Sequence, residues 1–455
     1  MKTNKLIILT IVAAFFASCE SQLENDPKQR EDAAITLTTE KGVTDVLSGT
    51  YSIFATGDVY GGRLQVSADL LAQTGVTATT NFRWRGTFAT FRQMYNKSML
   101  VDSGLIQAIW QRNYEIVNAT NTVIENIGLV EDPEKAKTMV AEAKFLQSLA
   151  YFDLVRFFAK PYDATITNSQ LGVVIRPKAI YDFDTDLSAE RSTVQEVYTL
   201  VINGLNQAYA DLPVDNSFYA NKYAAKALLA RVYLQQQNYS AALSAANEVI
   251  TNSGAELSPT YKDAFNHDVN QIEDIFAIQI TKQTGDNQLV NHYGSEKVGG
   301  RGGDIEIRAN YLNKFSDPND ERRNFNYINP DNGRRLTSKF TNEFADVPII
   351  RLAEMLLIRA ECNFILDSAV GATPLDDINA LRTRAKAATF TSVTLPLILN
   401  ERVLELAMEG FAIHDIKRTK GSISAAYPWN SDLLVFPIPL RETDNNKKIT
   451  QNSGY

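Results

Sequence analysis

The sequence predicts a mostly α-helical protein, in which a tetratricopeptide-like scaffold of helix pairs bears an irregular, loop-rich lobe with short β-strands. Residues 222–250 place small and aromatic side chains at the spacing of a tetratricopeptide helix–turn–helix unit. Residues 353–364 and 375–387 indicate a second, degenerate helix pair. Between these pairs, residues 252–345 are rich in Gly, Asn, Asp and aromatic side chains and include short β-like runs such as 274–280, which favours an irregular lobe.

The scaffold helices are predicted from their apolar periodicity and from their ends. Thr193 and Glu196 have the spacing of a capping box, and apolar residues follow at helical intervals until Pro213 interrupts the pattern. Residues 141–162 are apolar over a wide arc, and their helix should end before Pro161. A wide apolar arc indicates a helix that is buried on two sides, as in a stack of helices. The repeat-like spacing within 222–250 rests on Leu229, Ala230, Tyr233, Tyr239, Ala242 and Ala246.

The first residues have the features of an exported lipoprotein. Two lysines precede an almost unbroken apolar run over residues 6–16, which is too short to span a bilayer as a helix. The small residues before Cys19 resemble a bacterial lipobox, whose cysteine is acylated and becomes the first residue of the mature protein. We therefore predict a signal peptide over 1–18, a lipid anchor on Cys19, a polar tether over 19–34 and a folded body over 35–455.

Composition narrows the classes of protein that fit the folded body. Cys362 is the only other cysteine, so the fold must be stabilised by a hydrophobic core and not by a disulfide. A chain of 455 residues, 44% of them hydrophobic, is sufficient for such a core. The formal charge of −8 and the lack of any basic run argue against a nucleic-acid partner. No later stretch approaches 18 consecutive apolar residues, so we expect the body to lie outside the bilayer.

Motifs for metals and cofactors are weak. The three histidines, His267, His292 and His414, are far apart and none belongs to an HExxH pair. The GGRGG run at 299–303 lacks the lysine of a phosphate-binding loop, so its sequence favours a flexible loop. The Asp-rich segments at 317–320 and 329–333 lack the ligand spacing of an EF-hand and favour turns. We therefore expect neither a cofactor nor a metal site.

Three glutamates have a spacing that suggests a shared role. Glu401, Glu405 and Glu409 recur every four residues and so fall on one face of a helix. A glycosidase needs two carboxyl groups that flank a bond, which one helix face does not provide. With Arg402 and Arg418 nearby, the pattern favours a structural ion-pair network. No nucleophile and base can be paired, so we expect no enzymatic activity.

One stretch has the composition of a ligand-binding surface. Residues 81–95 contain five aromatic side chains and three arginines. The aromatic residues after Gly86 keep helical spacing and are expected in the core, whereas Phe82 and Trp84 follow a loop-like run and alternate with arginines. A flat aromatic ring beside hydrogen-bond donors suits a sugar ring. The alternative for Trp84 is an ordinary half-buried tryptophan. The predicted binding residues here are Asn81, Phe82, Arg83, Trp84 and Arg85.

A series of segments along nearly the whole mature chain resembles, in the same order, the SusD/RagB family of nutrient-binding outer-membrane lipoproteins of Bacteroidetes. One departure concerns residues 412–414, where Ala, Ile and His stand in place of the Arg and aromatic residues usual in the family. The segments that carry the resemblance are 47–51, 109–124, 143–162, 191–213, 351–361, 378–385, 401–418 and 434–455. Trp110 matches the family's helical tryptophan and is expected in the core, as is Trp429, which precedes the closing segment.

The resemblance implies a SusD-like fold and a role in nutrient uptake at the cell surface. The lipid on Cys19 would anchor the protein to the outer membrane, where it would bind an oligosaccharide or polysaccharide. A SusC-like TonB-dependent transporter would receive the ligand, with the SusD-like protein as a hinged lid. The family's ligand sites lie on loops near residues 81–85 and in the irregular lobe, which adds Tyr293 and Arg301 to the expected binding residues.

Three other functions remain open at this stage. A peptide or protein fragment is one alternative ligand, because three arginines near the aromatic residues would suit carboxylates. A tetratricopeptide scaffold that binds only proteins is a second alternative. A surface glycosidase is a third, but it requires a catalytic carboxylate pair that the sequence does not provide.

Overall fold

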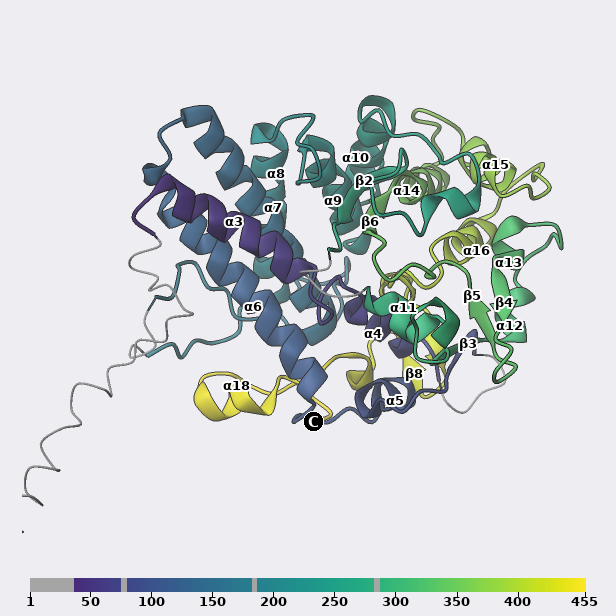
Figure 1. Cartoon of the computed structure of the whole chain (residues 1–455), viewed down its shortest axis with the longest axis horizontal. Helices are drawn as coiled ribbons and strands as arrows, with labels where there is room; N and C mark the ends of the chain where they lie inside the picture. The colour runs from purple at the N-terminus through teal and green to yellow at the C-terminus, as the bar shows by residue number, and fades with distance from the viewer. Residues whose placement is uncertain (1–36, 75–79, 182–185, 282–286) are drawn as a thin grey trace, which may run out of the picture.

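The computed structural model describes residues 37–74, 80–181, 186–281 and 287–455 (Figure 1). The predicted signal peptide, Cys19 and the tether lie outside these residues. The long helices are α3 (Glu40–Phe54), α6 (Gly104–Glu125), α7 (Pro133–Phe158), α8 (Val194–Asp211), α9 (Lys222–Gln235), α10 (Tyr239–Asn252), α14 (Leu352–Ile365), α15 (Pro374–Arg384) and α16 (Leu395–Glu405). The shorter helices are α4 (Arg63–Leu71), α5 (Ala89–Asn96), α11 (Gln288–Tyr293), α12 (Ala309–Leu312), α13 (Glu321–Asn324), α17 (Ala412–Arg418) and α18 (Leu440–Asn445).

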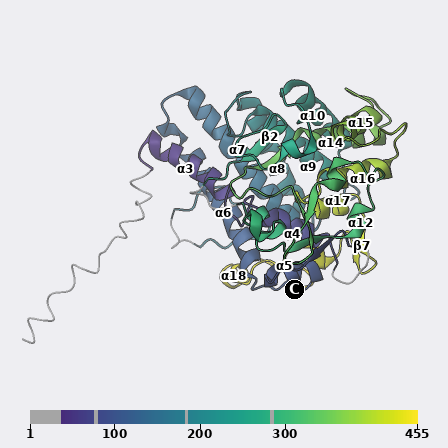
Figure 2. The same cartoon turned by 45° about the vertical axis from the view of Figure 1, so that its right-hand side comes forward.

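The long helices form the predicted scaffold. Helix α3 packs on α6, and contacts continue from α6 through α7, α8, α9 and α10 to α14, which also contacts α15 and α16. Figures 1 and 2 show this array as one continuous body. Helices α9 and α10 form the helix pair predicted over 222–250, and α14 with α15 forms the second pair. The mostly α-helical, repeat-like fold class is thus confirmed.

Local sequence signals explain where two of these helices begin and end. Thr193 and Glu196 form the predicted capping box at the start of α8. Helix α7 begins at Pro133, earlier than the apolar arc suggested, because the Asp132 side chain accepts hydrogen bonds from two backbone N–H groups of the first turn. It ends at Phe158, before Pro161, and most of its length is buried on both sides.

The lobe between the helix pairs is irregular, as predicted, and its strands are short. Each two-stranded sheet in the described residues is antiparallel. The sheet of β2 with β6 joins the lobe to the scaffold, since β6 leads directly into α14. The strands are β1 (Phe82–Trp84), β2 (Asp274–Ile278), β3 (Ile305–Ile307), β4 (Asn326–Ile328), β5 (Arg335–Thr337), β6 (Val347–Arg351), β7 (Ser422–Ser424) and β8 (Tyr427–Pro428); they pair as β1–β3, β2–β6, β4–β5 and β7–β8.

The departure at residues 412–414 is accommodated in the core. These residues open α17, and His414 is buried with its ring edge-on to Phe157, at 5.0 Å between ring centroids. Burial lowers the pKa of His414 well below its usual value, so the ring is neutral at physiological pH. Uncharged side chains, including the neutral ring of His414, therefore stand at 412–414 in place of the family's usual residues, and they leave no charged group in the core.

Candidate ligand-binding surface

The segment predicted to bind ligand is a short strand with one buried face. Strand β1 pairs with β3 in the register Phe82 to Ile307, Arg83 to Glu306 and Trp84 to Ile305. Its burial alternates, so that Phe82 and Trp84 point inward and Arg83 points to solvent. Because β1 pairs with β3 of the lobe, only the outward-facing side chains of this segment are accessible to a ligand.

The two aromatic side chains of β1 are core residues. Trp84 is 6% exposed, and its ring lies 5.4 Å from that of Phe91 and 6.1 Å from that of His292. Phe82 is 4% exposed and lies 5.2 Å from the ring of Tyr311. The expectation that Phe82 and Trp84 form an exposed stacking surface is therefore wrong, because pairing with β3 turns both rings toward the core.

Tyr293 is also turned inward. Its side chain is 0% exposed at the end of α11, and its hydroxyl donates to Asp69 Oδ2 at 2.8 Å. Burial raises the pKa of Asp69 to about 7, although the hydrogen bond from Tyr293 opposes this shift. Tyr293 thus ties the lobe to α4 and presents no face to a ligand, which corrects its predicted role.

The predicted arginines, in contrast, remain at the surface. Arg83 and Arg85 are exposed, and Arg85 Nε lies 2.7 Å from Glu306 Oε2 on the paired strand. Glu306 also accepts from Arg308, at 3.2 Å. Asn81 is partly buried, and its backbone carbonyl accepts from the Arg308 N–H at 2.9 Å. One carboxylate therefore pairs with two guanidinium groups along this edge.

Two further guanidinium groups meet at Thr87, in the turn that follows β1. Arg301 donates to Thr87 Oγ1 at 3.4 Å. Arg92, on α5, donates to the backbone carbonyls of Gly86 and Thr87 at 3.3 and 3.5 Å. Both arginines are exposed. We call Arg83, Arg85, Arg92 and Arg301 the arginine surface; Arg92 was not among the predicted binding residues, although it is the third arginine of the same stretch.

The glycine-rich run fixes the position of Arg301. Within 299–303, the backbone N–H groups of Gly300, Arg301 and Gly303 donate to carbonyls of residues 291–295, at N···O distances of 2.9, 3.0 and 2.8 Å. Gly303 has a φ of +75°, and a Cβ there would meet the side chain of a core leucine at 2.3 Å. The run is a loop, as predicted, and it folds back on α11 so that Arg301 faces Thr87.

A cavity of about 730 Å³ lies beside α6 and was not predicted from the sequence. Its walls include Trp110, Tyr114, Arg176 and Glu442. The Tyr114 hydroxyl donates to the Val174 carbonyl at 2.7 Å, which fixes one wall. The volume is typical of small-ligand pockets. Sequence reasoning placed Trp110 in the core, which is confirmed, but it gave no signal that residues so distant in the chain enclose a cavity.

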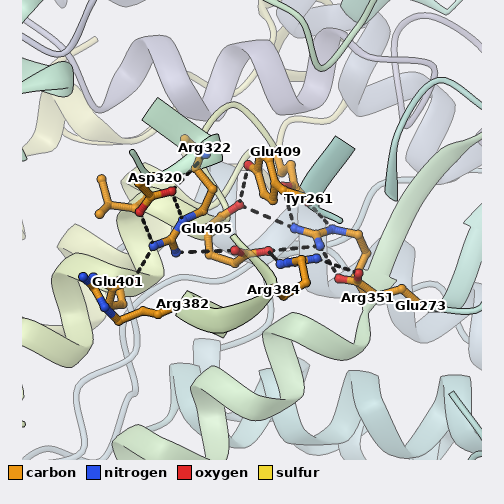
Figure 3. Close-up of polar contacts among 12 residues, drawn as sticks. Tyr261, Glu273, Asp320, Arg322, Arg351, Arg382, Arg384, Glu401, Glu405 and Glu409 are labelled. Atoms are coloured by element: carbon orange, nitrogen blue, oxygen red, sulfur yellow. Dashed lines mark hydrogen bonds and ion pairs between the residues drawn. The ribbon is translucent and has the colours of Figure 1, made fainter. Parts of the chain in front are cut away.

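The three spaced glutamates belong to a buried ion-pair network (Figure 3). Glu405 is fully buried and pairs with Arg351 at 3.3 Å, with Arg322 at 3.5 Å and with Arg384. Burial raises the pKa of Glu405, but the charges of Arg384 and Arg351 outweigh burial and lower it to about 2. The carboxylate is therefore ionised at physiological pH and paired with arginines.

The predicted structural network is thus confirmed, but its partners differ from those expected. Glu401 pairs with Arg322 and Arg382, and Glu409 pairs with Lys339 and Arg351. The expected partners instead form other pairs: Arg402 with Asp415 and Glu354, and Arg418 with Glu361 and Asp415.

The histidines and the other acidic residues form no metal centre in the part of the chain that the structure describes. There, no three His, Cys, Asp or Glu side chains gather in a way that could bind an ion. His292 is buried and its Nδ1 lies 3.0 Å from Asp304 Oδ2. Burial lowers the pKa of His292, although Asp304 opposes the shift, so this pair supports the core beneath β1.

Comparison with known proteins identifies the family. Residues 23–234 match a family model described as starch-binding and associating with the outer membrane, and residues 233–432 match the model of the SusD family. The chain belongs to the SusD/RagB family. The description of the family model combines starch binding with association with the outer membrane. None of the helices that the structure describes is both long and apolar enough to cross a membrane.

Individual relatives support this assignment along the whole chain. The SusD-like protein P2 of Formosa agariphila is 25% identical to this chain, and the match covers 100% of both proteins. The starch-binding protein SusD of Bacteroides thetaiotaomicron is 29% identical over 38% of this chain and 32% of its own. A SusD superfamily structure from the same species superposes with a TM-score of 0.80 at 24% identity, covering 91% of this chain and 99% of that one, and confirms the fold.

Proposed function

We propose that this protein is a lipid-anchored, cell-surface member of the SusD/RagB family that binds glycans and passes them to a SusC-like, TonB-dependent outer-membrane transporter. The observation that carries the proposal is the pair of family matches over residues 23–432, whose description combines starch binding with the outer membrane. The lipid on Cys19 would supply the attachment to the membrane, and two or three acyl chains are sufficient for stable anchoring.

The proposed activity is binding and transfer, without bond cleavage. Glu401 and Glu405, two of the three regularly spaced glutamates, are buried and paired with arginines, which supports a structural and not a catalytic role for them. The exposed arginines have N–H groups that can donate hydrogen bonds to sugar hydroxyls and to charged substituents. A peptide remains the alternative ligand for the same role, because its carboxylates would also accept from these arginines.

Binding without turnover is the first test. Purified protein is titrated with a panel of oligosaccharides and acidic peptides, and each mixture is then incubated for a day and assayed for new reducing ends. We expect a glycan to bind and no new ends to form. Reproducible cleavage that a single Glu or Asp substitution abolishes would contradict the proposal, and binding of peptides alone would favour the alternative.

The anchor and the partner are tested in cells. Cys19→Ser should release the protein from the outer-membrane fraction, while a serine-to-alanine change at Ser18 serves as the neighbouring control. Detergent extracts of cells with the unaltered chain should yield a co-purifying TonB-dependent transporter. A Cys19→Ser protein that still fractionates with the outer membrane would show that the anchor is placed wrongly.

A further inference from the structure

The arginine surface lies in a part of the chain that is strongly positive, although the whole protein is acidic. The formal charge of the chain is −8, yet residues 70–101 contain no Asp or Glu and include Arg83, Arg85 and Arg92. Arg301 reaches this segment from the lobe and contacts it at Thr87. The segment includes β1 and α5, and β1 pairs with β3 of the lobe (Figure 1). The arginine surface is thus locally positive, although the chain as a whole is acidic.

Few of these charges are neutralised within the described residues. Glu306 is shared between Arg85 and Arg308. Arg92 and Arg301 donate only to uncharged oxygens, at the carbonyls and the hydroxyl described above. A guanidinium group that donates to neutral oxygens retains its full charge and has further N–H groups available.

Glu306 lies on the surface itself, and the other nearby carboxylates lie beneath it or beside the glycine-rich run, where Glu343 adjoins Gly299. Asp304 is buried under Gly86 and bonded to His292. Glu296 approaches the backbone at Gly302, so it moderates the charge at the lobe end of the surface. The side of the surface on β1 and α5 therefore has the greater excess of positive charge.

The ligand chemistry follows from what the surface offers and what it lacks. With Phe82 and Trp84 in the core, no ring of β1 is available to stack on a neutral sugar. Guanidinium groups form their strongest hydrogen bonds with carboxylates and with phosphate-like oxyanions, often through two parallel bonds. Several arginines along one edge match a chain that presents anions repeatedly, and such binding weakens with salt.

We propose that the arginine surface binds acidic glycans, that is, oligosaccharides whose uronate carboxylates or sulfate groups accept from Arg83, Arg92 and Arg301. This inference rests on the proposed function, since it names the class of glycan that the protein would bind. It adds a charge requirement that neither the family description nor the names of the relatives contain.

The test compares probes that differ only in charge. Full-length protein in detergent is titrated by calorimetry with hexagalacturonate and with its methyl ester, and with sulfated and unsulfated maltohexaose. We expect at least one charged probe to bind tenfold or more tightly than its neutral counterpart at low salt, and the difference to shrink at high salt. Preference for the carboxylate pair or for the sulfate pair identifies the anion.

Matched variants assign the binding to this surface. Arg92→Ala with Arg301→Ala should weaken binding of the charged probe tenfold or more and leave its neutral counterpart unaffected. Arg441→Ala, at an exposed arginine on α18, is the control and should change neither affinity. Circular dichroism checks that each variant is folded.

Two groups of results would overturn the inference. Equal affinity for charged and neutral probes would refute it and leave the proposed glycan-binding function standing. Unchanged binding of the charged probe by the double arginine variant would place the binding site for acidic glycans elsewhere. Tighter binding of hexaglutamate than of either charged glycan would make an acidic peptide the ligand instead. Failure of every charged probe to bind at millimolar concentration would also refute it.

Discussion

Replacing Trp84 with alanine separates the two roles that this residue could have. The indole is 6% exposed and packs against Phe91 and His292, and the backbone at Gly86 lies directly on it, since a Cβ there would be 2.5 Å from the ring. Among the residues that the structure describes, the indole N–H has no hydrogen-bond partner. The cost of Trp84→Ala is therefore the loss of apolar burial together with the cavity that remains, about 3–5 kcal/mol.

For a body of roughly 400 residues, a loss of this size corresponds to a fall in melting temperature of about 3–6 °C. Thermal unfolding followed by circular dichroism measures it, and Trp84→Phe should recover a large part of the stability because it keeps a ring in the site. Arg83→Ala, next in the chain but exposed, is the control and should leave the melting temperature within about 1 °C. An unchanged melting temperature for Trp84→Ala, with loss of glycan binding, would refute the inward orientation of the ring.

Two further predictions concern buried carboxylates, and both are measured by denaturant unfolding as a function of pH. Glu405→Gln leaves buried arginines unpaired and should cost about 3–5 kcal/mol. The pKa of Glu405 is lowered to about 2, so its ionised form contributes about 3 kcal/mol to the free energy of unfolding. This contribution is complete above about pH 4.5 and is lost as the pH falls toward 2. A stability difference between variant and wild type that stays constant over that pH range would contradict the prediction. Asp69 should give a pH dependence of the opposite sign. Its pKa is raised to about 7, so the free energy of unfolding falls by at most about 4 kcal/mol as the pH rises from about 4 to 7. Asp69→Asn keeps an acceptor for Tyr293 and should remove that fall; a variant as pH-dependent as the wild type would exclude Asp69 as its source.

The scaffold could be predicted from sequence because its signals are local. A capping box such as that of Thr193 and Glu196 joins residues three apart, and the apolar faces of α7 and α9 repeat within one helix. Such patterns are independent of what the helix packs against. They therefore predicted the helix pairs. The start of α7 was missed although its signal, Asp132 directly before Pro133, is equally local.

The orientation of β1 depended on residues far away in the chain. The alternation of Phe82, Arg83, Trp84 and Arg85 after a loop-like run predicts, by itself, a loop that presents rings beside donors. The same alternation is typical of a strand with one buried face, and its partner β3 lies more than 200 residues later. Tyr293 was misplaced for a similar reason, since Asp69 binds its hydroxyl from α4. Trp429, also expected in the core, is only partly buried, beside Lys420.

The ion-pair network also constrains the order in which the protein can become compact. Arg322 and Arg351 lie well before α16 in the chain, and α16 carries their partners Glu401 and Glu405. Until α16 takes its place, closing the lobe around these arginines would bury positive charge that lacks part of its compensation, at a cost of several kcal/mol. We therefore expect the lobe to close only together with α16, and a chain truncated before residue 401 should remain expanded and open to proteases.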